Sequence, residues 1–199
     1  MGYLKEKTMD KDTKLYSLIG VSALEDGLAK DFNDFFKELD INSKVIPLNI
    51  REDDIGFFLN GFKDSQIKAA YFTQEYWTTI ASLVEDSSDE VKACQMADTI
   101  SVVDGKNIAD VVYGKAVVEL LKTKIDLANS TISFANHYPT SLSIIFNLEK
   151  ETTKELSLIK KESDVVVDEA ITIHGKELKY EEIIKQIAKI KTKEWNNNG

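Results

Sequence analysis

The chain has 199 residues, a hydrophobic content of 43% and a formal net charge of −9 at pH 7. This length is enough for one large or two small domains with a substantial core, and the negative charge argues against nucleic acid or an anionic membrane as the main partner, because both bind basic surfaces. Cys94 is the single cysteine, no apolar run reaches the ~18 residues of a membrane span, and the charged first residues lack a signal-peptide core, so we expect a cytoplasmic protein without internal disulfides.

The first 96 residues alternate between short apolar runs and amphipathic stretches, which predicts strands followed by helices. The predicted order is a strand at 15–20, a helix at 28–40, a strand at 45–50, a helix at 55–62, a strand at 67–73, a helix at 75–84 and a helix that is capped by 86–89 and reaches about 96. Pro47 indicates an edge position for the second strand, because proline cannot donate to a neighbouring strand. The first helix should bury one apolar stripe: Leu28, Phe32, Phe35, Phe36 and Leu39.

A β-hairpin is predicted next. Two runs rich in β-branched residues, 99–103 and 107–112, flank an Asp104-Gly105 pair, and Asp-Gly between such runs is typical of a two-residue hairpin turn. The spacing of apolar residues then changes from every second residue to every third or fourth, which predicts a helix beginning near Gly114.

The remaining residues carry a weaker pattern. It predicts a strand at 131–136, a helix from Pro139 to about Glu149, a strand at 164–168 that continues at 171–173 before a turn at His174-Gly175, and a helix at 180–190. Residues 149–163 have no clear assignment.

Strands that alternate with helices predict an α/β fold of three layers, with a mainly parallel sheet between helices. We place a first domain at 14–121 and a second at 122–199. In such sheets ligands bind at the carboxyl ends of the strands, which here are the loops after the first and third strands and those around Asp98 and Tyr113.

Residues 95–121 resemble part of a known family. In shikimate dehydrogenases a run of small residues ending in Asn-Thr begins a strand, a hairpin follows, and Asn-Thr-Asp-Gly leads into a linking helix. Asp98-Thr99 and residues 111–114 stand at those positions here. The resemblance extends over about 14–121 and implies the substrate-binding domain of a shikimate dehydrogenase.

The resemblance also assigns substrate-binding positions, most of which hold other residue types. The two serines that bind the substrate carboxylate in the family fall on Asp26, which would repel a carboxylate, and on Leu28, which cannot donate a hydrogen bond. The family pattern Asn-Val-Thr-x-Pro-x-Lys falls on 71–77, where Thr73 is retained. The pocket positions implied in this way are Asp26, Leu28, Tyr71, Thr73, Asp98 and Thr99.

The catalytic lysine and aspartate of the family, which act on the proton of the substrate hydroxyl, fall on Trp77 and Tyr113. An indole has no basic group, and a phenol with a pKa of ~10 is a poor base at neutral pH. We therefore expect no catalytic residue at either position.

By the same resemblance, the second half should bind a dinucleotide through a glycine-rich turn. After the strand at 131–136 the chain continues with His137-Tyr138-Pro139 and has no glycine in the turn, and G-x-G-x-x-G occurs nowhere in the sequence. Bulky side chains and the missing proline N–H would obstruct the pyrophosphate. We expect a shortened Rossmann-like unit that binds no NADP(H).

Two functional hypotheses remain, with a structural or assembly role as a third. The leading one is a non-catalytic relative that binds an unidentified small molecule or protein. Asp26, Glu75 and Asp98 would give it a mildly acidic pocket for a cationic or neutral ligand, unless they are simply exposed loop carboxylates. The aromatic residues expected to line the same cleft are Tyr71, Trp77 and Tyr113. The alternative is an NADP-dependent oxidoreductase acting on shikimate, 3-dehydroshikimate or a related substrate. The two histidines, His137 and His174, lack the spacing of a metal site or a nucleophilic triad.

Overall fold

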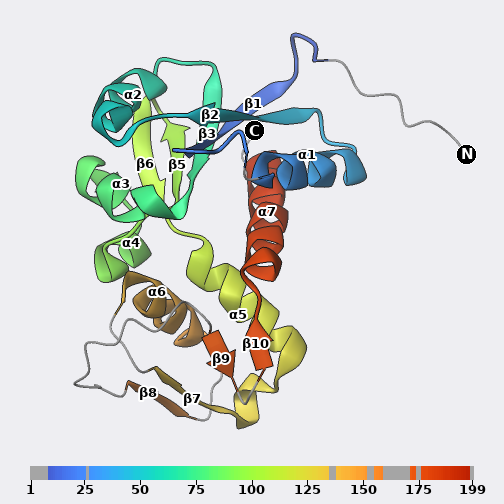
Figure 1. The fold of residues 1–199 in the computed structure, drawn as a ribbon, viewed down its shortest axis with the longest axis vertical. Coiled ribbons are helices and arrows are strands. Elements are labelled where there is room, and N and C mark those ends of the chain that lie inside the picture. The colour runs from blue at the N-terminus through green and yellow to red at the C-terminus, as the bar shows by residue number, and fades with distance from the viewer. Residues whose placement is uncertain are drawn as a thin grey trace, which may run out of the picture.

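The computed structural model of the chain describes residues 9–25, 27–134, 138–151, 155–158, 171–173 and 176–197. Asp26, His137, the predicted strand at 164–168 and the predicted turn at 174–175 lie outside the described residues. The described chain forms two parts, which Figure 1 shows one above the other: a sheet lobe (14–112), built on a six-stranded sheet, and a small lobe (113–178) with two short sheets. Among the described residues, no helix has the length and apolar character needed to cross a membrane.

The sheet lobe confirms the predicted α/β architecture with a mainly parallel sheet. Its strands lie in the order β2-β1-β3-β5-β6-β4. They are β1 (Lys14–Gly20), β2 (Ser43–Asn49), β3 (Ile67–Phe72), β4 (Asp86–Ser87), β5 (Thr99–Val103) and β6 (Lys106–Asp110). β1 is parallel to β2 and β3, and β4 is parallel to β6, whereas β5 runs antiparallel to both of its neighbours. β2 is an edge strand, as Pro47 indicated.

Helices cover both faces of this sheet. They are α1 (Leu28–Glu38), α2 (Ile55–Phe62), α3 (Trp77–Leu83) and α4 (Asp89–Cys94), with short 3₁₀ turns at Glu52–Asp54 and Gln74–Tyr76. Figure 1 shows α1 on one side of the sheet and α2 and α3 on the other. The segment predicted to cap the fourth helix does so through Ser88, whose hydroxyl oxygen accepts a hydrogen bond from the Val91 N–H. The two residues before Ser88 form the short strand β4, which was not predicted from the sequence.

Of the five stripe residues of α1, three are buried, Phe35 is partly buried and Leu39 is exposed. Phe32 and Phe36 have almost no exposed surface and pack into the core, whereas Leu39 is 47% exposed. The prediction for Leu39 was wrong because α1 ends at Glu38, so that the next side chain no longer follows the helical spacing. The hairpin prediction is confirmed: Asp104 and Gly105 have φ angles of 50° and 73°, the left-handed conformations that a type I′ turn requires.

The small lobe contains a short Rossmann-like unit. Its elements are α5 (Tyr113–Lys124), a 3₁₀ turn (Leu127–Asn129), β7 (Thr131–Phe134), α6 (Pro139–Leu148), β8 (Glu155–Leu158), β9 (Ile171–Ile173) and β10 (Lys176–Leu178). β7 and β8 are parallel strands with α6 between them in the chain, which is the βαβ arrangement, and β9 pairs antiparallel with β10. Proline is common at the first position of a helix, and α6 begins at Pro139 as predicted, whereas β8 falls in the stretch without an assignment.

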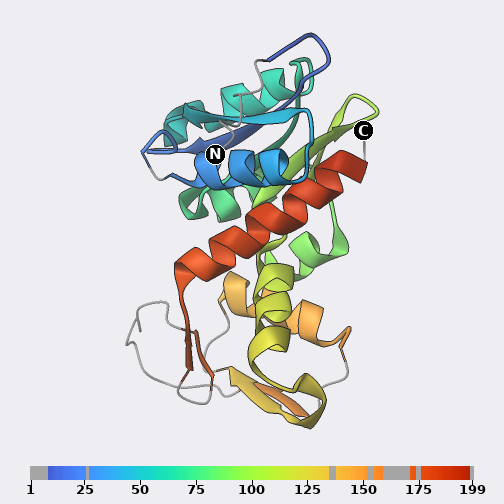
Figure 2. The ribbon, with the colours of Figure 1, turned by 90° about the vertical axis from the view of Figure 1, so that its right-hand side faces the viewer.

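The last helix, α7 (Tyr180–Asn197), is longer than predicted and returns to the sheet lobe. Figure 2 shows it rising from the small lobe and lying beside α1. The Trp195 ring stacks on Tyr16 and Phe32 with centroid distances of 4.4 Å and 5.4 Å, and the Tyr16 hydroxyl donates a hydrogen bond to the Trp195 carbonyl. Residues beyond the predicted end at 190 therefore complete the core of the first lobe.

Candidate functional site

One cavity lies where the sequence predicted a pocket, at the carboxyl ends of β1 and β3. We call it the strand-end cavity; its volume is about 660 Å³. It lies between the loop after β1, the start of α1, the turn after β3 and the first turns of α7. Its lining residues are Ser22, Gly27, Leu28, Asp31, Thr73, Gln74, Glu75, Tyr180, Glu181, Ile184 and Lys185.

Glu75 is held at the edge of this cavity by two hydrogen bonds. Its carboxylate accepts the Thr73 hydroxyl at 2.6 Å and the Val21 N–H at 2.9 Å. Burial opposes the charge of this group, but the hydrogen bonds from Thr73 and Val21 outweigh that effect and lower the pKa of Glu75. The loop can approach so closely because Gly20 has no side chain: a Cβ there would lie 2.4 Å from the Thr73 hydroxyl oxygen.

The predicted pocket residues divide into two groups in the structure. Leu28 and Thr73 line the strand-end cavity. Tyr71 and Thr99 are buried in the core and line neither this cavity nor the second one described below. Tyr71 packs against Phe32 at a ring-centroid distance of 5.9 Å.

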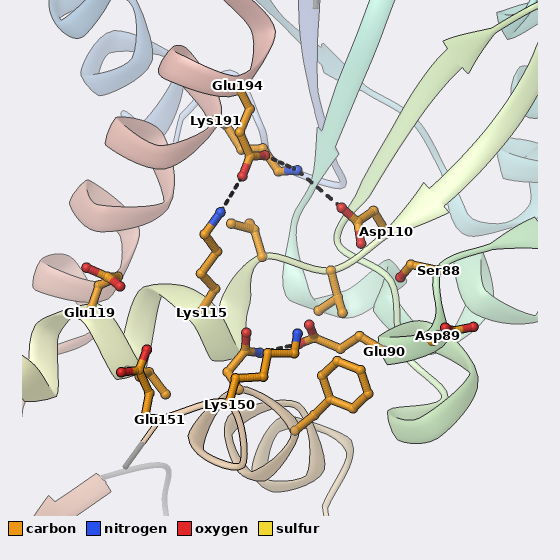
Figure 3. Close-up of a pocket in the computed structure, with 15 residues that line it drawn as sticks. Ser88, Asp89, Glu90, Asp110, Lys115, Glu119, Lys150, Glu151, Lys191 and Glu194 are labelled. Carbon is orange, nitrogen blue, oxygen red and sulfur yellow. Dashed lines mark hydrogen bonds and ion pairs between the residues drawn. The ribbon is translucent and has the colours of Figure 1, made fainter. Parts of the chain in front are cut away.

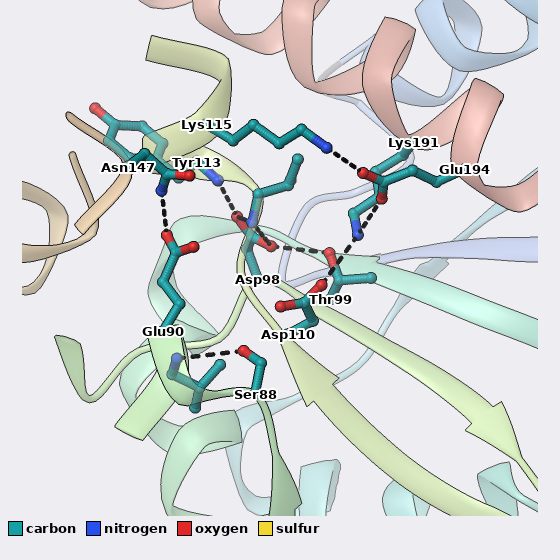
Figure 4. Close-up of polar contacts among 12 residues, drawn as sticks. Ser88, Glu90, Asp98, Thr99, Asp110, Tyr113, Lys115, Asn147, Lys191 and Glu194 are labelled. Atoms are coloured by element: carbon teal, nitrogen blue, oxygen red, sulfur yellow. Dashed lines mark hydrogen bonds and ion pairs between the residues drawn. The ribbon is translucent and has the colours of Figure 1, made fainter. Parts of the chain in front are cut away.

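Asp98 does not line a cavity either, which corrects the prediction that it opens onto a pocket. The residue has no exposed surface. Its carboxylate accepts the N–H groups of Val112 (2.9 Å) and Tyr113 (2.8 Å) and the Thr99 hydroxyl (2.8 Å), so it caps the N-terminus of α5 (Figure 4). Burial raises the pKa of Asp98 to about 7, although the Lys191 charge and the hydrogen bond from Thr99 act in the opposite direction.

Trp77 and Tyr113 are brought together, but in the core. Their ring centroids are 5.2 Å apart, and both side chains are buried. The Trp77 indole donates a 2.7 Å hydrogen bond to the Phe72 carbonyl. The expectation that these two residues line an open cleft is therefore wrong: they are the first residues of α3 and α5, and the starts of these two helices meet in the core.

A second cavity, of about 610 Å³, lies between the two lobes (Figure 3). We call it the interlobe cavity. Its walls come from α4, the end of β6, α5, α6 and α7. The lining residues are Ser88, Asp89, Glu90, Asp110, Val111, Val112, Lys115, Val118, Glu119, Phe146, Asn147, Lys150, Glu151, Lys191 and Glu194. Nothing in the sequence indicates this cavity, because these residues come from five elements and share no local spacing.

Ion pairs close the α7 side of the interlobe cavity. Lys191 is 3% exposed, and its ammonium lies 3.0 Å from the Glu194 carboxylate and 3.8 Å from that of Asp110. Lys115 of α5 pairs with the same Glu194 at 2.7 Å. Figure 4 shows this chain of charges running from α5 through α7 to the end of β6. The interaction ties α7 to both lobes.

Glu90 lies on the side of the interlobe cavity opposite α7, and its hydrogen-bond network connects α4, α5 and α6. Its Oε1 accepts hydrogen bonds from the Ser143 hydroxyl and the Asn147 amide of α6, each at 2.7 Å. The Gly114 N–H of α5 in turn donates to the Ser143 hydroxyl oxygen at 3.0 Å. Burial raises the pKa of Glu90, although these two hydrogen bonds and the Lys150 charge act to lower it. Within the described part of the chain, no group of three potential metal-ligating side chains occurs.

Comparisons with known proteins give a likeness to shikimate dehydrogenases in sequence and in fold. No family model matches the chain. The chain is similar in sequence to the shikimate dehydrogenase (NADP(+)) of Methanococcus maripaludis, with 25% identity over 144 residues, which are 72% of this chain and 52% of the relative. The chain thus spans about half the length of that relative.

Solved structures share the fold. The shikimate 5-dehydrogenase of Listeria monocytogenes, solved in complex with shikimate and NAD, superposes with a TM-score of 0.68 at 15% identity, covering 94% of this chain and 61% of that one. The shikimate dehydrogenase of Aquifex aeolicus gives a TM-score of 0.64 at 21% identity, covering 78% and 59%. The chain therefore has a shikimate-dehydrogenase-like α/β fold, in agreement with the resemblance found in its sequence.

Proposed function

We propose that this chain is a non-catalytic, shikimate-dehydrogenase-like protein that binds a small molecule in the strand-end cavity. The contact between Trp77 and Tyr113 carries the proposal. By resemblance, these two positions hold the lysine and aspartate that move a proton in the family. Here they hold two rings that pack together in the core, and neither has a group that accepts a proton at neutral pH.

The chemistry of the strand-end cavity favours a cationic or neutral ligand over an anion. Asp31, Glu75 and Glu181 line it together with Lys185. The pKa of Glu75 is lowered, so its charge persists at neutral pH. A carboxylate such as shikimate would meet repulsion from these groups, whereas an amine or a polyol would find acceptors.

The start of α6 argues against dinucleotide binding. In a Rossmann unit the pyrophosphate accepts N–H groups at the N-terminus of the helix that follows the first strand. The corresponding helix here begins at Pro139, which has no N–H, and the sequence has no glycine between β7 and α6. We therefore propose that the chain binds neither NADPH nor NADH.

A titration and a rate measurement on the wild-type chain test the non-catalytic part. NADPH fluorescence should not change at micromolar protein, and no NADP-dependent oxidation of shikimate should be seen, with the Methanococcus maripaludis enzyme as the positive control. A micromolar dissociation constant or measurable turnover would favour the oxidoreductase alternative. The wild type is the protein of choice, because Trp77→Lys or Tyr113→Asp would bury a charge in the core and destabilise the fold.

A fragment screen by ligand-observed NMR tests the binding part. We expect amines and polyols among the hits, with few carboxylates, and we expect Ser22→Trp to abolish the hits because its indole would occupy the cavity. Ser82→Trp is the matched control, since Ser82 is exposed on α3 and lines neither cavity. Hits that survive Ser22→Trp would show that the strand-end cavity is not the binding site.

A further inference from the structure

The interlobe cavity is distinct from the strand-end cavity and has a wall suited to an apolar group. The two cavities share no lining residue. Val111, Val112, Val118 and Phe146 contribute apolar side chains to the interlobe cavity. Its volume of about 610 Å³ is within the range of sites that hold drug-sized ligands, roughly 300–1,000 Å³.

Glu90 presents an acceptor to this cavity. The side chain is 7% exposed, and the hydrogen bonds that it accepts from Ser143 and Asn147 both reach the same oxygen, Oε1. Among the described residues, no donor forms a hydrogen bond with Oε2. Oε2 is not among the side-chain atoms that are sealed from solvent without a partner, so it remains open to a ligand that supplies an N–H.

The chain's own Lys150 marks a position for a cation beside Glu90. Its ammonium lies 4.1 Å from the centroid of the Phe146 ring, a cation–π contact, and its charge acts to lower the pKa of Glu90. Figure 3 shows Glu90 and Lys150 directed toward the same part of the cavity. Lys150 is exposed and has a long side chain with many rotamers, so another ammonium could displace it.

The interlobe cavity offers fewer binding partners to an anion than to a cation. The ammonium groups of Lys115 and Lys191, the other lysines of the lining, are already paired with Glu194, and Lys191 also lies near Asp110. The carboxylates of the lining outnumber its lysines. A ligand carboxylate that pairs with Lys115 or Lys191 would have to break existing ion pairs, and one that pairs with Lys150 would lie beside the Glu90 carboxylate. A ligand ammonium meets neither cost.

We propose that the interlobe cavity binds a small primary amine with an apolar body. The ammonium contacts Glu90 Oε2 and the face of Phe146, in place of Lys150, and the apolar body packs against the valines that follow β6 and the valine of α5. The ligand thereby contacts both lobes. This site does not depend on the proposed function of the strand-end cavity.

Three probes of similar size test the charge requirement by calorimetric titration: 2-phenylethylamine, 2-phenylethanol and 3-phenylpropionate. We expect the amine to bind with a dissociation constant on the order of 0.1–1 mM, the alcohol at least about tenfold more weakly, and the carboxylate more weakly still. Equal binding of the three probes, preference for the carboxylate, or no binding of the amine at about 10 mM would each overturn the proposal.

Two variants with opposite expected effects localise the site. Glu90→Gln keeps a side chain of the same shape but removes the charge, and should weaken 2-phenylethylamine binding about tenfold or more. Lys150→Ala removes the competing ammonium from an exposed position and should strengthen binding about threefold to tenfold. Tighter binding cannot result from a damaged fold, so Lys150→Ala keeps the test decisive if Glu90→Gln unfolds.

The matched control is Glu38→Gln, which removes an exposed carboxylate that lines neither cavity and should leave 2-phenylethylamine binding unchanged. Glu181→Gln removes a carboxylate from the strand-end cavity alone and reports any amine bound there. If Glu181→Gln weakens binding and Glu90→Gln does not, the amine binds in the strand-end cavity; that result would overturn this proposal while supporting the proposed function. Weaker binding in Lys150→Ala would also overturn it, because it would show that the lysine attracts the ligand.

Discussion

The small lobe and α7 are joined to the sheet lobe by two contacts of different chemistry. At the C-terminal end of α7, Trp195 inserts between Tyr16 and Phe32, and the contact is almost entirely apolar. Beside the interlobe cavity, the contact is a buried polar network that links Glu90, Ser143 and Gly114. Apolar contact gives free energy in proportion to the area buried and tolerates small shifts, whereas a buried polar network is favourable only when each partner is in place.

We therefore expect the two contacts to have different roles. The contact of Trp195 with Tyr16 and Phe32, which we call the apolar joint, should supply most of the free energy that holds α7 to the sheet lobe. The network of Glu90, Ser143 and Gly114, which we call the polar joint, should fix how α5 and α6 lie against α4, and with it the shape of the interlobe cavity. Substitutions at Trp195, Gly114, Ser143 and Asp98 test this view, and they follow in decreasing order of the change expected in the free energy of unfolding.

Trp195→Ala should have the largest effect, a loss of about 3–5 kcal/mol, because it leaves a cavity between Tyr16 and Phe32. Urea melts of the wild type and the variant measure the loss. Trp195→Phe should cost clearly less, since it keeps a stacked ring, and Phe57→Ala should cost little because Phe57 is 86% exposed. A loss for Trp195→Ala as small as that for Phe57→Ala would show that α7 is not anchored by this residue.

Gly114→Ala should cost about 1–3 kcal/mol, because the new Cβ would lie 2.2 Å from the Ser143 carbonyl oxygen and would push α5 and α6 apart. Gly61→Ala is the matched control: Gly61 is in α2, and nothing lies within 4 Å of a Cβ at that position. The control should be neutral or stabilising, since alanine favours a helix over glycine. Equal effects of the two substitutions would mean that the close approach at Gly114 carries no strain.

Ser143→Ala should cost about 1–3 kcal/mol by leaving the Gly114 N–H without its acceptor and Glu90 without one of its donors. Ser82→Ala, which removes an exposed hydroxyl that donates to the Thr79 carbonyl, should have a much smaller effect. Thermal melts of both variants provide the comparison. If the two serines prove equivalent, the polar network does not contribute to the joint.

Asp98 should give the smallest effect when it is taken per pH unit, and the effect should be visible as a dependence of the free energy of unfolding on pH. Its pKa is raised to about 7 in the folded chain, against about 3.9 when unfolded, so between these values the folded state holds a proton that the unfolded state has lost. The free energy of unfolding should therefore fall as pH rises through this range, by on the order of 1 kcal/mol per pH unit, and level off above about pH 7. Asp98→Asn should remove this slope.

Urea melts of the wild type and Asp98→Asn at about pH 5 and about pH 7 measure the difference between their slopes. Other titrating groups contribute to both proteins and cancel in that difference. The raised pKa of Asp98 would be contradicted if the free energy of unfolding changed with pH equally in both proteins. It would also be contradicted if the wild type gained stability relative to the variant as pH rises.

The fold could be predicted from the sequence where the signal is local. The hairpin at Asp104-Gly105 follows from a residue pair that accepts left-handed backbone angles, and the start of α6 follows from Pro139. The end of α7 could not be predicted, since residues 191–197 carry mostly polar and charged side chains that become helical by packing on α1 and α5. Burial of Lys191 in that segment has no sequence signal at all.

The candidate site was predicted in part. Leu28, Thr73 and Glu75 follow strand ends in the sequence and line the strand-end cavity, because the carboxyl ends of neighbouring parallel strands meet at one edge. Asp98 was expected at the same edge, but its carboxylate is turned inward to the N–H groups of α5. Whether a loop carboxylate faces solvent or a helix end depends on side-chain direction, which spacing does not encode.

The order of strands and helices and the likeness to shikimate dehydrogenases could be read from the amino-acid sequence, because both depend on residues close together in the chain and on the periodicity of their apolar side chains. Three other features became visible only in the folded chain: Trp77 packs on Tyr113, α7 completes the sheet lobe, and Glu90 faces a cavity between the lobes. These outcomes depend on contacts between segments far apart in sequence, where burial and hydrogen-bond partners are set by how whole elements pack rather than by local pattern.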